Sequence, residues 1–485
     1  MAPKLNFVNS PPLLILRRHG MATNSRLSPC PNCEEPISKR ATECPHCDHV
    51  FRRVAHKTRI IPWLTITVIL LGLIGAAYTA GWCGGPGTDP IKDVVVSPDD
   101  WPWWRGPSYN NIAEGEPPAT HWSQDENIVW KTPVPGLGHG SPIVAGKRIF
   151  LLTADDLKET MSLVCFYRES GQLLWETELH RGGLMHKSLK NSYASSTPAC
   201  DGQRVFATFI TRGGLWLTAT DLDGEILWQK LVAPFQSEHG YASCPLIYRS
   251  LVIVAGDNLE PSFLTALDRR TGETVWQVPR HQGGSYGSPV VATLAGNEQL
   301  LLSGQGFVTS YNPSDGQTLW SSQAMSPSMI GTIAWHNDFV FATSLHGTVC
   351  IRADGVGDVS HSHVAWASRV KANVPSPLVV EDRLIVVQDD GIVSCLSVRS
   401  GEQHWKKRLG GNISASPVLA GEYVYVPNEE GRTFVFKAAA DFELVAENDL
   451  GDSSFASPVI CGGRIYLRTE HQLFCIGKTK AAIEN

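Results

Sequence analysis

Several features that define large protein classes are missing from this sequence. Between residues 127 and 477 no long run of apolar residues follows the helical period, so most of the chain is not helical. No glycine-rich loop precedes a Val-Ala-Ile-Lys-like strand and no His-Arg-Asp triplet occurs, which excludes a protein kinase. No adjacent cysteine pair occurs, and no cysteine spacing indicates a disulfide framework. These absences leave an all-β domain without an evident catalytic motif.

Positive charge is scarce outside the front of the chain. The 485 residues carry a formal net charge of −6, and residues 1–60 hold ten Lys and Arg against four Asp and Glu. The remaining residues therefore carry −12. We expect no nucleic acid as their partner, because an acidic domain repels a phosphate backbone.

A short sequence motif recurs about every 45 residues, and this repeat determines the architecture. It opens with a small residue and proline, runs through an apolar stretch and ends in a glycine turn four residues before a tryptophan. These tryptophans are Trp175, Trp228, Trp276, Trp320 and Trp405, and the opening prolines are Pro142, Pro198, Pro245, Pro289, Pro377, Pro417 and Pro458. Halfway between the fourth and fifth prolines, Ile333 opens a degenerate unit. The sequence therefore contains eight openings.

Units of this length are typical of four-stranded propeller blades. The last unit has only three strands, ending in 472–476, and an early strand at 127–131 has no blade of its own. Pairing of the two would close the ring and leave no exposed edge at the seam. We therefore predict an all-β, eight-bladed β-propeller over residues 119–478, followed by a tail at 479–485.

The recurring tryptophans predict packing between blades, since a buried aromatic brings much apolar area to a repeat that has no core of its own. Two units depart from the pattern. In the fifth, Trp366 lies well beyond the turn at Gly355, and in the seventh, Asp441 and Val445 replace the glycine and the tryptophan. We expect these two blades to dock less tightly on their neighbours.

The front of the chain contains an apolar segment at 60–82 that is long enough to cross a bilayer. The alternative is a signal peptide, but the run starts some 60 residues into the chain. Basic residues precede it, which predicts a cytoplasmic N-terminus and an extracytoplasmic propeller at the inner membrane. We expect residues 1–25 to be disordered or to precede the true start of translation, which is Met1 or Met21. In the expected linker, 83–118, a cluster of three tryptophans either plugs one end of the ring or packs on an outer blade.

Before the apolar segment, two Cys-x-x-Cys pairs predict a zinc ribbon over residues 26–52. The ligands are Cys30, Cys33, Cys44 and Cys47. Four thiolates at this spacing fit one tetrahedral structural zinc. Haem attachment is excluded, because Glu34 and Asp48 stand where it needs a histidine.

The loops before the first strands of the blades should gather at one mouth of the ring. Their polar and aromatic residues are His139, His186, Lys190, Tyr193, His239, Tyr241 and Tyr286. Convergent groups of this kind form a candidate ligand site in the central channel. Alternatively, they simply line a wet channel.

Residues 266–276, Ala-Leu-Asp-Arg-Arg-Thr-Gly-Glu-Thr-Val-Trp, closely resemble the tryptophan-docking repeat of PQQ-like β-propellers. The resemblance covers residues 101–477 and extends to the propeller lipoprotein of the outer-membrane β-barrel assembly machinery. Residues 30–51 resemble zinc ribbons that precede a membrane anchor in bacterial proteins. Quinone-dependent dehydrogenases of the family need calcium ligands, a catalytic aspartate and adjacent cysteines. This chain has no adjacent cysteines, so we expect neither PQQ nor catalytic residues.

These observations favour a membrane-anchored scaffold or binding protein of the bacterial cell envelope, with a protein or envelope partner on the propeller. The zinc ribbon could have a cytoplasmic partner. One alternative is a PQQ-dependent or other small-ligand oxidoreductase that uses the central channel. A second is a sensor or adaptor that works through separate signalling partners.

Overall fold

A computed structural model describes residues 27–29, 36–38, 94, 96–323 and 329–478 of the chain, which divides into compact units at 1–89 and 90–485. In the first unit, β1 (Leu27–Pro29) and β2 (Pro36–Ser38) form an antiparallel pair. The predicted zinc ligands, the span at 60–82, residues 1–25 and the tail lie outside the described residues. Among the described residues, no helix has the length and apolar character needed to span a membrane.

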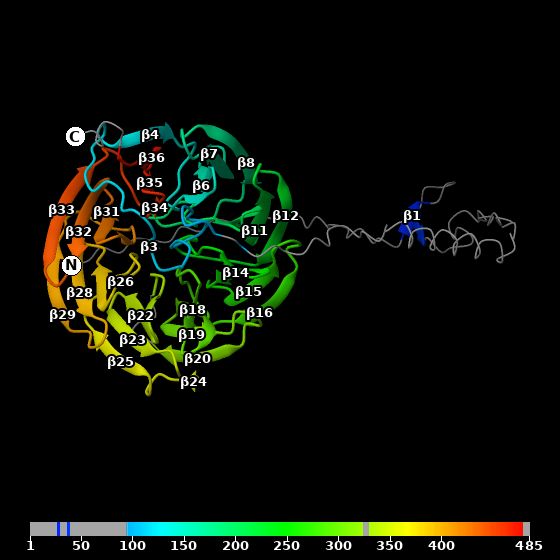
Figure 1. The fold of residues 1–485 in the computed structure, drawn as a ribbon. Coiled ribbons are helices and arrows are strands. Elements are labelled where there is room, and N and C mark those ends of the chain that lie inside the picture. The colour runs from blue at the N-terminus through cyan, green and yellow to red at the C-terminus, as the bar shows by residue number, and fades with distance from the viewer. Residues whose placement is uncertain (1–26, 30–35, 39–93, 95, 324–328, 479–485) are drawn as a thin grey trace, which may run out of the picture. The chain divides into compact units, whose positions relative to one another are not determined.

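The second unit is a ring of eight four-stranded antiparallel sheets around a central axis (Figure 1). Blade 1 consists of β5 (Ile143–Ala145), β6 (Arg148–Asp155), β7 (Thr160–Tyr167) and β8 (Leu173–Arg181), and blade 2 of β9 (Ala199–Cys200), β10 (Arg204–Thr211), β11 (Gly214–Asp221) and β12 (Ile226–Ala233). Blade 3 consists of β13 (Leu246–Tyr248), β14 (Leu251–Gly256), β15 (Phe263–Asp268) and β16 (Thr274–Pro279), and blade 4 of β17 (Val290–Leu294), β18 (Asn297–Gly304), β19 (Phe307–Tyr311) and β20 (Thr318–Gln323). Within each blade, successive strands run from the axis to the rim.

Blades 5 to 8 complete the ring in the same way. Blade 5 consists of β21 (Ala334–His336), β22 (Phe339–Ser344), β23 (Gly347–Arg352) and β25 (Val364–Ser368), and blade 6 of β26 (Leu378–Val380), β27 (Arg383–Val387), β28 (Ile392–Ser397) and β29 (Gln403–Arg408). Blade 7 consists of β30 (Val418–Ala420), β31 (Tyr423–Pro427), β32 (Arg432–Ala438) and β33 (Phe442–Asp449), and blade 8 of β34 (Val459–Cys461), β35 (Arg464–Arg468), β36 (Gln472–Ile476) and β4 (Ile128–Pro133). The early strand β4 pairs with β36, and Trp130 stands opposite Cys475. The predicted blade number and closure are confirmed.

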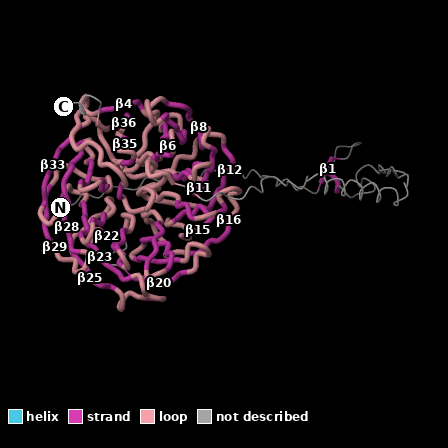
Figure 2. The backbone as a smooth tube through the Cα atoms, viewed as in Figure 1, coloured by secondary structure: helices cyan, strands magenta, loops and turns pink. Residues whose placement is uncertain are grey.

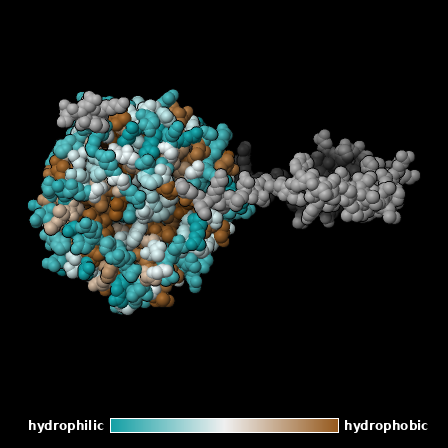
Figure 3. Space-filling model, viewed as in Figure 1, coloured by the Kyte–Doolittle hydropathy of each residue, from teal (hydrophilic) through white to brown (hydrophobic). Residues whose placement is uncertain are grey.

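The core of the propeller lies between blades. Every residue of β14 is buried, whereas the outer strand β16 of the same blade is mostly exposed. A strand that is covered on both faces reads as a continuous apolar run, and this explains the Val- and Leu-rich middle strands. Strands make up nearly all the regular structure in Figure 2, and the rim is largely hydrophilic in Figure 3.

The repeated tryptophans join neighbouring blades. Trp130, Trp175, Trp228, Trp276 and Trp366 lie against Gly171, Gly224, Gly272, Gly316 and Gly401 of the following blade, each glycine with positive φ. A side chain at these glycines would collide with the indole, so the turn needs glycine for both conformation and space. The indole nitrogens of Trp228 and Trp366 donate to the carbonyls of Arg269 (3.1 Å) and Val398 (2.9 Å). The tryptophans therefore pack between blades, as predicted.

The expectation of loose docking in the fifth blade is wrong, because Trp366 makes the same glycine contact as its counterparts. The extra residues of this unit leave the blade instead. Part of them, β24 (Gly357–Asp358), pairs in parallel with β20 of the preceding blade, where Trp320 is fully buried. In the seventh blade, Val445 packs against the hydrophobic cluster that contains Trp122 from the N-terminal segment.

The tryptophan cluster before the propeller crosses the ring, and we call residues 101–113 the plug. Its main chain bonds to Val144 of blade 1 through Trp101 (2.8 and 2.9 Å). The Tyr109 hydroxyl donates to the carbonyl of Ile247 in blade 3 (2.9 Å). The plug ends in β3 (Ile112–Ala113), which pairs in parallel with β30 of blade 7. Of the two placements expected for the cluster, the structure has the first, across one end of the ring.

Candidate functional site: a cavity on the propeller axis

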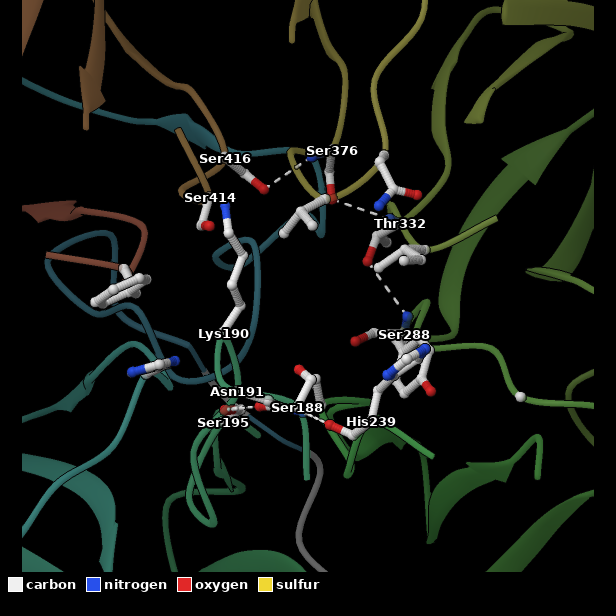
Figure 4. A pocket seen from close by; sticks show the side chains of 18 of the residues that line it. Ser188, Lys190, Asn191, Ser195, His239, Ser288, Thr332, Ser376, Ser414 and Ser416 are labelled. Atoms are coloured by element: carbon white, nitrogen blue, oxygen red, sulfur yellow. Dashed lines mark hydrogen bonds between the residues drawn. The ribbon is translucent and has the colours of Figure 1, made fainter. Parts of the chain in front are cut away.

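The propeller axis contains a cavity of about 980 Å³ to which all eight blades contribute. Trp104 of the plug lies at its closed end and donates a hydrogen bond to the Thr332 hydroxyl (3.1 Å). Loops that enter the first strands form the opposite, open end, which Figure 4 shows. The cavity therefore has one mouth.

A ring of small polar residues surrounds the cavity near its closed end. Each blade contributes the residue that stands two positions before its first strand, directly before the opening proline or, in blade 5, before Ile333: Ser141, Thr197, Cys244, Ser288, Thr332, Ser376, Ser416 and Ser457. The backbone N–H of one member donates to the side-chain oxygen or sulfur of the next in seven successive steps of 2.8–3.3 Å. The Ser141 hydroxyl closes the circle on the carbonyl of Ser457 (2.9 Å).

This ring explains the small residue that opens each repeat. The eight positions need a side chain short enough to fit near the axis and able to accept an N–H that would otherwise be buried without a partner. The sequence places this small residue directly before each opening proline or Ile333, but its bonding partners lie in other repeats. The role of the preceding residue becomes apparent only when the blades stand side by side.

The structure brings four of the seven predicted mouth residues to the cavity: His139, Lys190, His239 and Tyr286. The other three, His186, Tyr193 and Tyr241, line a much smaller neighbouring pocket. Tyr241 is buried and donates to the carbonyl of Ala255 (3.1 Å). The Lys187 ammonium lies 4.9 Å from the centre of the Tyr193 ring. These three side chains therefore point away from the main cavity.

His139 is a strongly perturbed titratable group that lines the cavity. Its ring stacks on Phe455, with centroids 4.1 Å apart and planes 14° apart. Burial, reinforced by the positive charges of Arg468 and Lys187, lowers the pKa of His139 to about 4. The imidazole is therefore neutral at pH 7 and can donate or accept one hydrogen bond.

The charged groups at the mouth are already engaged. The Lys190 ammonium lies 3.3 Å from a carboxylate oxygen of Glu429, which also accepts a hydrogen bond from Ser414 (2.7 Å). The two oxygens of Asp389 accept backbone N–H groups of Asn373 (2.8 Å) and Val374 (3.0 Å). The carboxylates of Asp389 and Glu238, which both line the cavity, form no ion pair among the described residues, whereas its single lysine is already paired, so an anionic ligand finds no unpaired lysine or arginine there.

The residues of the cavity do not fit a calcium–quinone pair. A quinone with carboxylate groups needs cations, and Lys190 is held by Glu429. Calcium needs six to eight oxygen ligands, but the Asp389 oxygens are occupied by backbone donors. Within the described ranges, the group of His and carboxylates closest to a metal site is Asp452, Glu470 and His471, none of which lines the cavity. His471 is already bonded to Asp452 (2.9 Å).

Sequence reasoning missed several residues of the site. Trp104, Gln305, Asp389 and Phe455 line the cavity, and Glu429 pairs with Lys190 at its mouth. Asp389 and Glu429 lie in turns at the same place in successive repeats, in Gln388-Asp389-Asp390-Gly391 and Asn428-Glu429-Glu430-Gly431. This recurrence of acidic residues in the turn between second and third strands was the available signal.

Comparison with known proteins gives a consistent result. Over 333 residues, the chain is 24% identical to the outer membrane protein assembly factor BamB of Bordetella pertussis, covering 67% of this chain and 78% of that protein. Among solved structures, BamB from Moraxella catarrhalis shares the fold with a TM-score of 0.52 and 16% identity, over 73% of this chain and 98% of that one. A europium-containing methanol dehydrogenase has a TM-score of 0.60 and 11% identity, over 79% and 98%.

A family model covers most of the ring. Residues 159–407 and 389–480 match the model described as outer membrane protein assembly factor BamB, and together they exceed half of the chain. They run from the third strand of blade 1 to the end of β36, so the match includes the blades that line the cavity. The chain therefore belongs to the PQQ-like propeller family of the outer membrane protein assembly factor BamB.

Proposed function

We propose that this chain is a scaffold of the bacterial cell envelope, whose propeller binds a protein partner outside the cytoplasm. The family match over residues 159–480 is the observation that carries the proposal. The cavity supports a binding role, since its single lysine is paired with Glu429 and its residues do not fit the calcium–quinone chemistry of the dehydrogenase relatives. A shared repeat does not transfer catalysis, because activity depends on the residues of the site.

The front of the chain completes this proposal. The apolar stretch at 60–82 would anchor the protein in the inner membrane, and Cys30, Cys33, Cys44 and Cys47 would hold one structural zinc on the cytoplasmic side. The hairpin of β1 and β2 supports the metal site, since Cys30 and Cys33 stand in the sequence between its strands. Metal analysis of the full chain should give one zinc per molecule, and Cys44→Ser should lower that ratio.

Cross-linking in intact cells, followed by purification of the full chain from solubilised membranes, tests the scaffold. The expected result is an envelope protein recovered with the wild-type chain in a fixed ratio. A chain with the same anchor and an unrelated outer domain serves as the control. Equal recovery of the same proteins by both chains would contradict the scaffold role.

A small ligand in the cavity is the second candidate, favoured by the single mouth and the closed floor at Trp104. Thermal unfolding with added PQQ and calcium distinguishes the two proposals, because a ligand that binds only the folded state raises the melting temperature. We expect no shift with PQQ and calcium. A saturable upward shift that Trp104→Ala abolishes would establish a quinone site and make the oxidoreductase the better assignment.

A further inference from the structure

The segment between β8 and β9 carries side chains over the mouth of the cavity, and we call residues 182–198 the mouth loop. One side of this loop is fixed to the next loop around the ring. The Asn191 side-chain amide donates to the carbonyl of His239 (2.6 Å), and the backbone N–H of Ser188 donates to the same oxygen (3.3 Å). These bonds hold the backbone on both sides of Leu189 and Lys190 beside blade 3.

The tip of the mouth loop reaches in the other direction. Lys190 extends across the opening toward Ser414, as Figure 4 shows, and its ammonium pairs with Glu429 in the turn between β31 and β32. The ion pair joins the entry of blade 2 to blade 7, and two blades lie between them. Leu189, next to it, lines the mouth and is fully exposed.

The two partners are held very differently. The Glu429 side chain is 16% exposed, its carboxylate accepts the Ser414 hydroxyl, and its backbone N–H donates to the carbonyl of Asn412 (2.8 Å). The Lys190 side chain is 65% exposed, and the bond to Glu429 is its sole hydrogen bond among the described residues. The acidic partner is a fixed receptor, whereas the lysine can leave it by simple rotation of its flexible stem.

We propose that the Lys190–Glu429 ion pair is a latch that holds the Lys190 side chain across the cavity entrance. Release of the pair widens the entrance without opening the ring, because the blade contacts are made elsewhere. Only the lysine has to move, and water replaces its single bond. The latch goes beyond the proposed scaffold role and does not depend on the identity of any partner.

The chain contains its own reporter for this opening. Cys244 belongs to the ring of small residues and lines the cavity, whereas Cys350 is completely buried between strands of blade 5. Trp104 closes the other end, so a thiol reagent reaches Cys244 through the mouth. Labelling by N-ethylmaleimide, resolved by peptide mass spectrometry, therefore separates opening of the mouth from opening of a blade.

The test compares the full chain with variants of the latch. Lys190→Met should raise the labelling rate of Cys244 about two- to five-fold, the range expected for loss of a partly exposed ion pair. Amide hydrogen exchange in the mouth loop should change little, because the bonds of Ser188 and Asn191 to His239 remain. Lys190→Glu should act like Lys190→Met, and combining it with Glu429→Lys should restore the wild-type rate. Lys437→Met is the matched control, since it removes an ion pair with Glu422 (3.4 Å) away from the cavity.

Varying the salt concentration provides a second, independent test of the ion pair. Raising the ionic strength from about 0.1 M to 1 M shortens the Debye length from about 10 Å to 3 Å. Labelling of Cys244 should then accelerate in the wild-type chain and change little in Lys190→Met. The latch is refuted if Cys244 reacts equally fast in the wild type and in Lys190→Met. It is also refuted if Cys244 and Cys350 accelerate together, because the substitution would then loosen the whole fold.

Discussion

The indole nitrogen of Trp130 donates a hydrogen bond of 3.0 Å to the backbone carbonyl of Arg168. Trp130 belongs to the early strand that completes blade 8, and Arg168 belongs to blade 1. One side chain therefore ties the beginning of the propeller to both blades that meet at the seam. In an open-ended repeat array the terminal units lack a neighbour, and here this residue supplies that contact.

Replacement of this residue should weaken the whole propeller. The Trp130 side chain is half-buried, so Trp130→Ala should lower the free energy of unfolding by about 2 kcal/mol, roughly half the cost for a fully buried tryptophan. Urea denaturation gives the measurement, as a lower transition midpoint. Leu157→Ala, at a side chain that is 98% exposed, should leave the midpoint in place. Equal midpoints for Trp130→Ala and the wild type would show that the seam contributes nothing to stability.

Two of the glycine turns allow the effect of backbone strain on stability to be measured separately from the effect of packing. Gly224 has a φ of +91°, and a methyl group there would lie 2.6 Å from the Thr177 hydroxyl and 2.9 Å from the Trp175 ring. Gly202 has a φ of +86° and no atom within 4 Å of the same position. Both alanine variants carry the positive-φ strain, but only Gly224→Ala also crowds the neighbouring blade. Its destabilisation should exceed that of Gly202→Ala by about 1 to 3 kcal/mol in urea denaturation.

Much of the propeller could be predicted because one constraint repeats. Most blades place an apolar strand between two neighbours and carry, before their last strand, a glycine turn that receives a tryptophan of the preceding blade. Eight openings and an unpaired strand at 127–131 therefore predicted both the blade number and the pairing of this strand with 472–476, in which Trp130 stands opposite Cys475. Where the same type of residue recurs at a fixed position of the repeat, the sequence alone predicts the contact that this residue makes.

The remaining features depend on where irregular segments go in space. The length of the insertion in the fifth unit does not reveal that β24 joins blade 4 and leaves Trp366 free to dock. Likewise, His186 and Lys190 belong to one loop, but only Lys190 lines the cavity. The conformation of the loop determines which of its residues face the propeller axis, and the sequence repeat does not predict that conformation.

The buried hydroxyl groups of two tyrosines predict opposite effects of the same substitution. The Tyr109 hydroxyl anchors the plug through its hydrogen bond to Ile247 (2.9 Å). The Tyr425 hydroxyl is buried without a hydrogen-bond partner among the described residues. Tyr109→Phe should cost about 1 kcal/mol of unfolding free energy, whereas Tyr425→Phe should be neutral or slightly stabilising. Urea denaturation of both variants decides the matter, and equal losses would contradict the bond that anchors the plug.

His139 should make the propeller less stable in mild acid. Burial lowers the pKa of His139 to about 4, whereas the unfolded chain has a histidine pKa near 6.5. Between these values the unfolded state binds the additional proton, so stability rises with pH and is lost as the pH falls below 6.5. For His139 alone, the loss between pH 7 and pH 5 is about 2 kcal/mol.

Substitution isolates this contribution from that of His180, whose pKa burial also lowers to about 4. His139→Gln keeps a polar side chain but cannot take up a proton, so its unfolding free energy should fall by about 2 kcal/mol less than that of the wild type between pH 7 and pH 5. His404→Gln, at an exposed position of β29, is the matched control and should leave the pH dependence as it is. If the unfolding free energies of His139→Gln and the wild type fell equally between pH 7 and pH 5, the cavity would admit water that solvates the imidazolium. The stacked pair of His139 and Phe455 would then be an open wall of the cavity, and not a sealed one.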